Sequence, residues 1–382
     1  MQTKILVPVI VFGFAVAAAV DSSCALQPAE RMSIDRQVKL SPGHLMMPYK
    51  IRHASNGDVI VFGSTDQFDT RPWATRLSAN GDVRWDLVIG GPNGPPIDRS
   101  ARGQRFFEAI DFSDQSTLLC GIRQVDQHNV VFLDKVGLDG TLMGEQLIRP
   151  TRPTPEKGGI GRVTCARWNG TIVLFGGISG FPRGTGWFAA LNDKLEVQTE
   201  KFGDQFVTYG ILDATAGNLF SIATDVPSPD GSTTSIVKFG KDGGITARHA
   251  LANGDDPYFV YPASPHAELR LALFKTTLKT EIVDLDDQLR AKGMTKLKNA
   301  GIKKCLELSD GSIAIFGSAF HGIATAAVTR LYEDGTSQGF LLEPQNQSPW
   351  FIDAAYTGHG TKSVAVRTTV DGGVVVEWIS FR

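Results

Sequence analysis

Short runs of alternating or continuous apolar residues, separated by polar turns, follow one another along most of the chain. The clearest example contains the runs Lys50–Ala54, Val59–Phe62, Trp73–Leu77 and Val83–Val88. The dipeptides Asn56-Gly57 and Asn80-Gly81 lie between runs, and such dipeptides favour the tight turns of β-hairpins. This stretch of about fifty residues therefore predicts a four-stranded antiparallel sheet.

The same pattern repeats along the chain, which is typical of a fold built from similar units. The turn between the third and fourth strands recurs, in intact or degraded form, at Asn80-Gly81, Asp139-Gly140, Asn192-Asp193, Asp242-Gly243, Asp286-Asp287 and Asp334-Gly335. The aliphatic second strand recurs in seven copies, at Ile60–Gly63, Leu118–Gly121, Val173–Gly176, Leu219–Ile222, Leu271–Phe274, Ile313–Gly317 and Val364–Val366.

The two ends of the repeat array complement each other. The last repeat stops after the run Val374–Ile379 and lacks an outer strand, whereas Met32–Leu40 is a spare strand ahead of the first repeat. Pairing these two strands would close a ring and remove two exposed sheet edges. We therefore predict an all-β fold, a seven-bladed β-propeller of four-stranded antiparallel blades that the N-terminal strand closes. Two stacked β-sandwiches are the alternative, but they leave the regular spacing unexplained.

The first repeat resembles the repeat of secreted bacterial β-propeller proteins. In that repeat, Gly followed by Ser or Thr ends an aliphatic strand, and a basic residue, Leu and an Asn-Gly or Asp-Gly turn precede a Trp-bearing strand. The corresponding segments here are Asp58–Ser64 and Trp73–Trp85. The resemblance is recognisable in the second repeat and at Val328–Gly335, and it fades between Tyr258 and Asn299. It implies an architecture and brings no active-site residues with it.

Residues 1–25 predict a secretory signal peptide, and residues 26–382 predict a single domain. Lys4 provides a positive charge, Ile5–Val20 is apolar and small residues follow, as in segments that direct secretion. The apolar stretch is short for a membrane-spanning helix, so we expect no transmembrane segment. Cys24 offers a lipid anchor as an alternative, although Asp21 stands where such motifs carry an aliphatic residue. We expect a monomer that is secreted or periplasmic.

Three cysteines follow this segment, namely Cys120, Cys165 and Cys305. An odd number argues against a disulfide framework, even in an oxidising compartment. We therefore interpret all three as small buried hydrophobic residues, which is the usual role of a free cysteine. A Cys120–Cys165 bridge between neighbouring repeats is the alternative.

The composition fits a turn-rich protein with an ample core, because the 382 residues include 41 Gly, 42% hydrophobic residues and only 20% charged residues. The formal net charge of -2 produces no overall field that would attract nucleic acid, so we expect no nucleic-acid partner. Any function that depends on charge must therefore be local.

Basic residues gather in loops expected on one face of the ring, over the first three blades. They are Arg71, Arg99, Arg102, Arg105, Arg149, Arg152, Lys157, Arg162 and Arg183, with Trp187 nearby. Arginine side chains bind carboxylate or phosphate through two parallel hydrogen bonds. We therefore predict a binding protein whose ligand is acidic: a uronate-bearing glycan, a peptide carboxylate or an acidic partner protein. Solvated loop residues without a ligand are the alternative interpretation.

An enzyme acting in the central channel is the main rival function, in the manner of propeller-fold metal-dependent hydrolases and lactonases. The residues near the ends of the expected inner strands are His53, Asp111, Arg167, Asp213 and Glu307, at the mouth opposite the long loops. The seven histidines show no paired spacing typical of metal ligands. The chain also contains no G-x-S-x-G nucleophile motif. The sequence thus favours binding over catalysis, and it indicates neither a metal site nor a particular cofactor.

Overall fold

The computed structural model divides the chain into the units Met1–Arg31 and Met32–Arg382. The structure describes residues 32–40, 46–65, 71–89, 105–125, 128–152, 159–179, 185–204, 206–212, 218–225, 234–240, 242–252, 255–261, 269–275, 279–298, 301–320, 324–341, 350–357, 360–368 and 373–382. The predicted signal peptide and Cys24 lie outside these residues. Everything below concerns the second unit.

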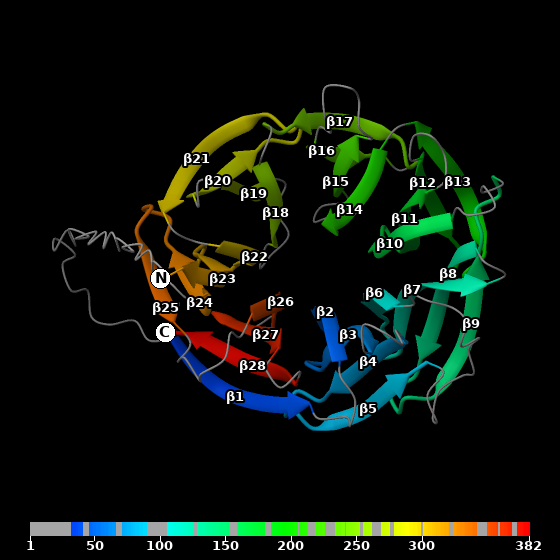
Figure 1. The fold of residues 1–382 in the computed structure, drawn as a ribbon, viewed down its shortest axis with the longest axis horizontal. Helices are drawn as coiled ribbons and strands as arrows, with labels where there is room; N and C mark the ends of the chain where they lie inside the picture. The colour runs from blue at the N-terminus through cyan, green and yellow to red at the C-terminus, as the bar shows by residue number, and fades with distance from the viewer. Residues whose placement is uncertain are drawn as a thin grey trace, which may run out of the picture. The chain divides into compact units, whose positions relative to one another are not determined.

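The strands of this unit surround a common axis, and each set of four successive strands is arranged in order from the inside of the ring to its rim (Figure 1). The innermost strands are β2 (Met46–His53), β6 (Arg105–Asp111), β10 (Gly159–Trp168), β14 (Phe206–Leu212), β18 (Asp255–Tyr261), β22 (Gly301–Glu307) and β26 (Trp350–Tyr356). The second strands are β3 (Val59–Thr65), β7 (Thr117–Val125), β11 (Thr171–Ser179), β15 (Leu219–Asp225), β19 (Leu269–Lys275), β23 (Ile313–Phe320) and β27 (Lys362–Thr368).

Two further strands complete each set of four antiparallel strands, which we call an antiparallel run. The third strands are β4 (Pro72–Leu77), β8 (His128–Val136), β12 (Thr185–Leu191), β16 (Thr234–Phe239), β20 (Lys279–Leu285), β24 (Ala324–Leu331) and β28 (Val374–Phe381). The outer strands are β5 (Val83–Val88), β9 (Leu142–Ile148), β13 (Val197–Asp204), β17 (Ile245–Ala250), β21 (Ala291–Lys298), β25 (Ser337–Leu341) and β1 (Met32–Leu40). The predicted all-β propeller fold with four-stranded antiparallel blades is confirmed.

The described strands are grouped into five sheets, three of four strands and two of eight. In each eight-stranded sheet, two antiparallel runs are joined by short parallel pairing only. Strands β8 and β10 pair at Asn129 and Gly159, and β18 and β22 pair at Val260 with Cys305 and at Tyr261 with Leu306. The two runs of each eight-stranded sheet count as one sheet because they approach closely enough to form hydrogen bonds at these residues.

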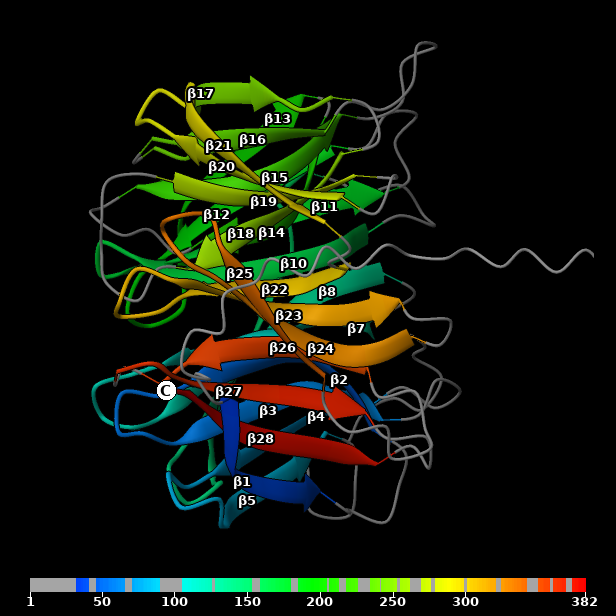
Figure 2. The ribbon, with the colours of Figure 1, turned by 90° about the vertical axis from the view of Figure 1, so that its left-hand side faces the viewer.

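The first and last described strands belong to one sheet. Strand β1 pairs antiparallel with β28, from Met32 opposite Phe381 to Leu40 opposite Val374. Figure 2 shows β26, β27 and β28 in order, with β1 beyond β28. The turn between β4 and β5 packs against this sheet at Gly81, which has a φ of 82°. A Cβ atom there would come within 2.8 Å of Val38, so both the turn and the contact favour glycine.

The hydrophobic core lies between the antiparallel runs. Phe62 of β3, Phe106 of β6 and Phe132 of β8 are fully buried in one cluster. The rings of Phe106 and Phe132 lie 5.2 Å apart, as measured between their centroids. Each run thus buries its faces against its neighbours, which holds the inner strands at fixed positions around the axis.

Two of the three cysteines form a disulfide, contrary to the expectation that all three are free. Cys120 of β7 and Cys165 of β10 are bonded, whereas Cys305 is free and buried. Three cysteines still allow one bridge with one cysteine left free. Both bonded residues belong to the same core cluster between two runs, so the fold brings them together.

Candidate functional site

A β-bulge occurs at the same level in four inner strands, and a charged residue follows it in each. The residues after the bulges are Lys50 in β2, Glu108 in β6, Lys304 in β22 and Asp353 in β26. Contacts join these strands in the order β22, β26, β2, β6, so the charges alternate in sign around this part of the axis. Bulges turn a strand locally and change where its side chains point. We call these four residues, together with Arg52, the axial belt.

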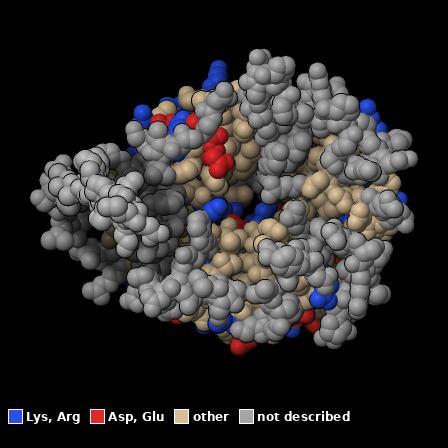
Figure 3. Space-filling model, viewed as in Figure 1, with Lys and Arg blue, Asp and Glu red and all other residues tan. Residues whose placement is uncertain are grey.

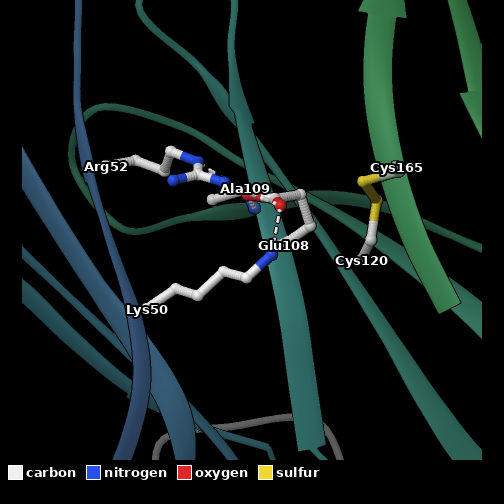
Figure 4. Close-up of a disulfide and its surroundings, with 6 residues drawn as sticks. All are labelled: Lys50, Arg52, Glu108, Ala109, Cys120 and Cys165. Atoms are coloured by element: carbon white, nitrogen blue, oxygen red, sulfur yellow. Dashed lines mark hydrogen bonds and ion pairs between the residues drawn. A yellow bond between two sulfur atoms is a disulfide. The ribbon is translucent and has the colours of Figure 1, made fainter. Parts of the chain in front are cut away.

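Glu108 is the most strongly held member of the axial belt. Its Oε2 atom accepts hydrogen bonds from Lys50 Nζ at 2.7 Å and from Arg52 Nη2 at 2.8 Å, and its Oε1 atom accepts one from Arg52 Nε at 2.7 Å (Figure 4). The residue is only 4% exposed. Burial raises the pKa of its carboxyl, but the charges of Arg52 and Lys50 outweigh burial and lower the pKa to about 2. Glu108 is therefore ionised at every physiological pH.

Asp353 and Lys304 form the other half of the belt. Lys304 Nζ lies 3.3 Å from Asp353 Oδ1, and the backbone N–H of Ile51 donates to Asp353 Oδ2 at 3.1 Å. Arg52 Nη1 lies 3.9 Å from Asp353 Oδ2 and so links the two halves. The Lys304 ammonium also lies 3.3 Å from the ring centroid of Tyr261, a cation–π contact. Burial lowers the pKa of Lys304 to about 8, although Asp353 opposes this shift.

The axial belt carries one more positive than negative charge when all its members are ionised. Lys50, Arg52 and Lys304 are the cations, and Glu108 and Asp353 are the carboxylates. Figure 3 shows basic and acidic side chains inside the hollow at the centre of the face in view. Because these groups are fixed by one another, they form a rigid network with one surplus positive charge near the axis.

A pocket of about 380 Å³ lies beside the belt, and we call it the axial pocket. It is lined by Arg52, His53, Glu108, Asp111, Arg167 and Tyr261, among others. Cys165 is also part of its wall, so the disulfide lies close to Glu108 (Figure 4). The volume is in the range of small-molecule sites.

Arg167 is the exposed cation of this pocket. Its guanidinium carbon lies 5.6 Å from the ring centroid of Phe112, and it forms no ion pair with another residue that the structure describes. By contrast, Asp111 is held in place, because Ser55 donates to its Oδ2 atom from both the backbone N–H and the hydroxyl, at 3.2 and 2.9 Å. A planar, exposed guanidinium can bind a carboxylate through two parallel hydrogen bonds.

The channel residues expected from the sequence are partly brought together. His53, Asp111 and Arg167 all line the axial pocket. Each pairs with a residue near the start of the second strand of its run, so all three lie close to the turn between the first and second strands. Glu307 lies 3.6 Å from Arg270 Nη1, and Asp213 lies outside the described residues. Within the described ranges, no three His, Cys, Asp or Glu side chains are placed to hold a metal ion.

Only some of the basic loop residues belong to the part of the chain that the structure describes. Arg99, Arg102, Lys157 and Arg183 lie outside the described residues, and only the backbone of Arg105 and Arg162 is described. Arg149 and Arg152 are exposed, Arg71 is half-buried, and the Arg152 guanidinium carbon lies 6.0 Å from the Phe202 ring centroid. Trp187, which the sequence places near these basic residues, is 2% exposed, and its Nε1 donates to Glu200 Oε1 at 2.7 Å. Its position in the core follows from its place on strand β12.

Sequence reasoning missed the axial belt. Its charges lie in short inner strands that look like ordinary half-exposed strands when each is taken alone. The signal is in the alignment of repeats, because Lys50, Glu108 and Lys304 pair with Phe62, Cys120 and Phe316, which hold equivalent positions in the aliphatic second strands. Aligning the inner strands by those second strands places the charges at one level.

Comparisons with known proteins support the fold. No protein-family model matches the chain, and no curated protein matches its sequence. The solved structure of the polysaccharide lyase Uly1 has a TM-score of 0.57 at 10% identity, covering 91% of this chain and 99% of that chain. The BP39L lectin from Burkholderia pseudomallei has a TM-score of 0.55 at 11% identity, covering 88% and 96%. The Dos1 propeller has a TM-score of 0.53 at 7% identity, covering 86% and 77%.

These likenesses place the chain among β-propellers by its fold, and at such low identities they establish the fold alone. Among the described residues, no helix is both long and apolar enough to span a membrane.

Proposed function

We propose that the protein is a binding β-propeller whose axial pocket takes a carboxylate-bearing small molecule. The observation that carries this proposal is the combination of a surplus positive charge in the axial belt with the exposed Arg167 guanidinium at the pocket wall. A bound carboxylate would balance the surplus charge and would form charge-assisted hydrogen bonds with Arg167.

The pocket is organised before the ligand arrives. Arg52 is held by Glu108 in a two-point ion pair, so its guanidinium needs no rearrangement when a ligand binds. Glu108 stays ionised because its pKa is about 2, which keeps this geometry constant with pH. A neutral molecule of the same size would gain none of the electrostatic attraction. We therefore expect strong discrimination between a sugar acid and the corresponding neutral sugar.

We also propose how many blades the fold has and where the protein works. We count seven four-stranded blades, with β1 as the outer strand of the blade that contains β28, and the antiparallel ladders support this count. We also propose that residues 1–25 direct secretion and that the remainder is one domain working outside the cytoplasm. The Cys120–Cys165 disulfide supports export, since such bonds persist in oxidising compartments. A lectin and a polysaccharide lyase among the fold neighbours are compatible with a sugar acid as ligand.

Calorimetric or NMR titration with D-galacturonate tests the proposal, with neutral D-galactose as the matched ligand. We expect the wild type to bind galacturonate and to bind galactose at least tenfold more weakly. Arg167→Gln should weaken galacturonate binding at least tenfold. The matched control is Arg152→Gln, because Arg152 is also an exposed arginine over a phenylalanine ring.

The outcome separates two locations for the acidic ligand. Loss of binding in Arg152→Gln, with Arg167→Gln unchanged, would move the site to the basic loops that include Arg149 and Arg152. Equal binding of galacturonate and galactose, or no binding of either, would overturn the proposal.

A further inference from the structure

A second pocket adjoins the axial pocket, and we call it the seam pocket because residues from both ends of the described chain line it. Its volume is about 630 Å³. The residues that matter here are Arg36 of β1, His53 and Asn56 at the turn after β2, and Lys362 and Trp378 of the sheet that contains β27 and β28. The pocket lies at the same end of the ring as the axial pocket, where the hairpin turns are.

The two pockets share a wall. His53 lines both of them. Ser55 lines the seam pocket and donates two hydrogen bonds to Asp111, which lines the axial pocket, at 3.2 and 2.9 Å. His53 and the Ser55–Asp111 pair therefore lie between the two pockets.

The seam pocket combines an apolar wall with polar and basic groups. Trp378 is half-buried, and the Arg36 guanidinium carbon lies 5.7 Å from its ring centroid. Arg36 is fixed in turn, since its Nη1 donates to the backbone oxygen of Ala79 at 2.8 Å. Lys362 is exposed at the pocket, and its charge acts on the carboxylate of Asp35. Asp35 is already hydrogen-bonded to Ser33 and Ser380.

This chemistry suits a sugar ring. A pyranose has an apolar face of C–H groups and a rim of hydroxyls, so it needs an apolar surface bordered by hydrogen-bonding side chains. Trp378 contributes apolar surface to the pocket beside the Arg36 guanidinium, and Asn56, Ser363 and Thr357 are among the polar residues that line the pocket. Arg36 and Lys362 add positive charge, which favours a sugar that carries an acid group. A purely apolar ligand would displace water from these charged groups without replacing the hydrogen bonds that they make to it.

We infer that the two pockets are subsites of one site for an acidic oligosaccharide. One uronate lies in the axial pocket, and the next sugar residues pass His53 and occupy the seam pocket. This inference rests on the proposed function, because the axial subsite is the carboxylate site described above. An acidic peptide shares the carboxylate but lacks the stacked C–H face that Trp378 would meet.

Titration of the full chain with D-galacturonate and with a tetramer of galacturonate tests the inference. We expect the tetramer to bind at least tenfold more tightly than the monomer. Lys362→Gln should weaken tetramer binding at least threefold and leave monomer binding unchanged, whereas Arg167→Gln should weaken both. Lys194→Gln is the matched control, since Lys194 is exposed and lies in the turn between β12 and β13, away from both pockets.

The results distinguish the two proposals. If the monomer binds as expected but the tetramer binds no more tightly, or if Lys362→Gln changes nothing, the extended site is wrong and the axial site stands. If neither probe binds, the proposed function fails and the inference fails with it. If tetraglutamate binds more tightly than the sugar tetramer and depends on Lys362, the ligand is a peptide and the oligosaccharide is excluded.

Discussion

Two buried carboxylates in the same antiparallel run, Glu108 of β6 and Asp134 of β8, behave in opposite ways. Glu108 receives three hydrogen bonds from Lys50 and Arg52, and its pKa falls to about 2. Asp134 is 0% exposed, and neither of its oxygens has a hydrogen-bond partner in the part of the chain that the structure describes. Burial is the larger cause, and the charge of Glu145, which lies directly opposite on β9, acts in the same direction; together they raise the pKa of Asp134 to about 7.

The difference shows that burial alone does not decide the charge of a group. At the axis, the cations come from another strand and hold Glu108 ionised. In the interior of the same run, Arg123 pairs with Glu145 instead, at 2.7 and 2.8 Å, so Asp134 receives no hydrogen bond from a cation and burial dominates its pKa. The axis is therefore one place where fixed charge is maintained, which is what a site for an ionic ligand requires.

The largest expected effect comes from removing the charge of Glu108. Glu108→Gln leaves Arg52 and Lys50 without their shared carboxylate, and breaking a buried ion pair in this way costs about 3–5 kcal/mol. We expect the free energy of unfolding, measured by urea denaturation at pH 7, to fall by that amount. Glu333→Gln is the control, since Glu333 is exposed and should change stability by less than about 0.5 kcal/mol. A loss below about 1 kcal/mol for Glu108→Gln would contradict the account of the belt.

The disulfide beside Glu108 should have the next largest effect. Cys120 and Cys165 are 45 residues apart in sequence, and a bridge closing a loop of this size stabilises a protein by about 2–4 kcal/mol. The double variant Cys120→Ala/Cys165→Ala should lose this much in urea denaturation. Reducing the wild type should have the same effect, and reduction should leave the double variant unchanged. Equal stability of oxidised and reduced wild type would show that the bridge does not form in solution.

Asp134 should make stability depend on pH in the opposite sense to a paired carboxylate. Its pKa of about 7 in the folded protein exceeds the ordinary value of 3.8, so the folded state binds more protons between these values. The contribution of Asp134 to stability therefore falls as pH rises from about 4 to 7. Relative to the wild type, Asp134→Asn should gain about 1–3 kcal/mol at pH 8 compared with pH 4. Denaturation curves across this pH range measure the gain, and a constant difference would show that Asp134 is not held as described.

The smallest expected effect concerns Lys304, whose pKa is about 8. Raising the pH from 7 to 9.5 removes its charge from the belt, which should weaken galacturonate binding about three- to tenfold, the effect of one nearby charge at a partly screened site. Lys304→Gln should bind with little change over the same pH interval. Calorimetric titrations at four pH values compare the two proteins. A wild-type affinity that stays constant to pH 9.5 would place Lys304 outside the electrostatics of the site.

Much of the fold could be predicted because its pattern is local. The run Val59–Phe62 and the turn at Asn80-Gly81 lie where the sequence places a strand and a hairpin turn, and the same reasoning extends to the later repeats. The degraded turn at Asn192-Asp193 also keeps its geometry, with Leu195 adopting a φ of 64°. Local pattern is sufficient for such features because hydrogen bonds between neighbouring strands determine them.

The site was predictable only in part because its residues come from distant repeats. His53, Asp111 and Arg167 were expected near the channel, and the axial pocket brings them together. The pairing of Arg52 with Glu108 and Asp353 depends on which inner strands are neighbours and on the bulges that turn their side chains. Neither follows from the pattern within one repeat. The disulfide is similar, since it depends on the spacing of two adjacent runs.

The most direct test of the central claim is a crystal structure of the protein soaked with D-galacturonate. Our account predicts the carboxylate in the axial pocket, within hydrogen-bond distance of the Arg167 guanidinium and beside Arg52. Galacturonate bound instead at Arg149 and Arg152, or bound in the axial pocket with its carboxylate turned away from Arg167, would contradict it.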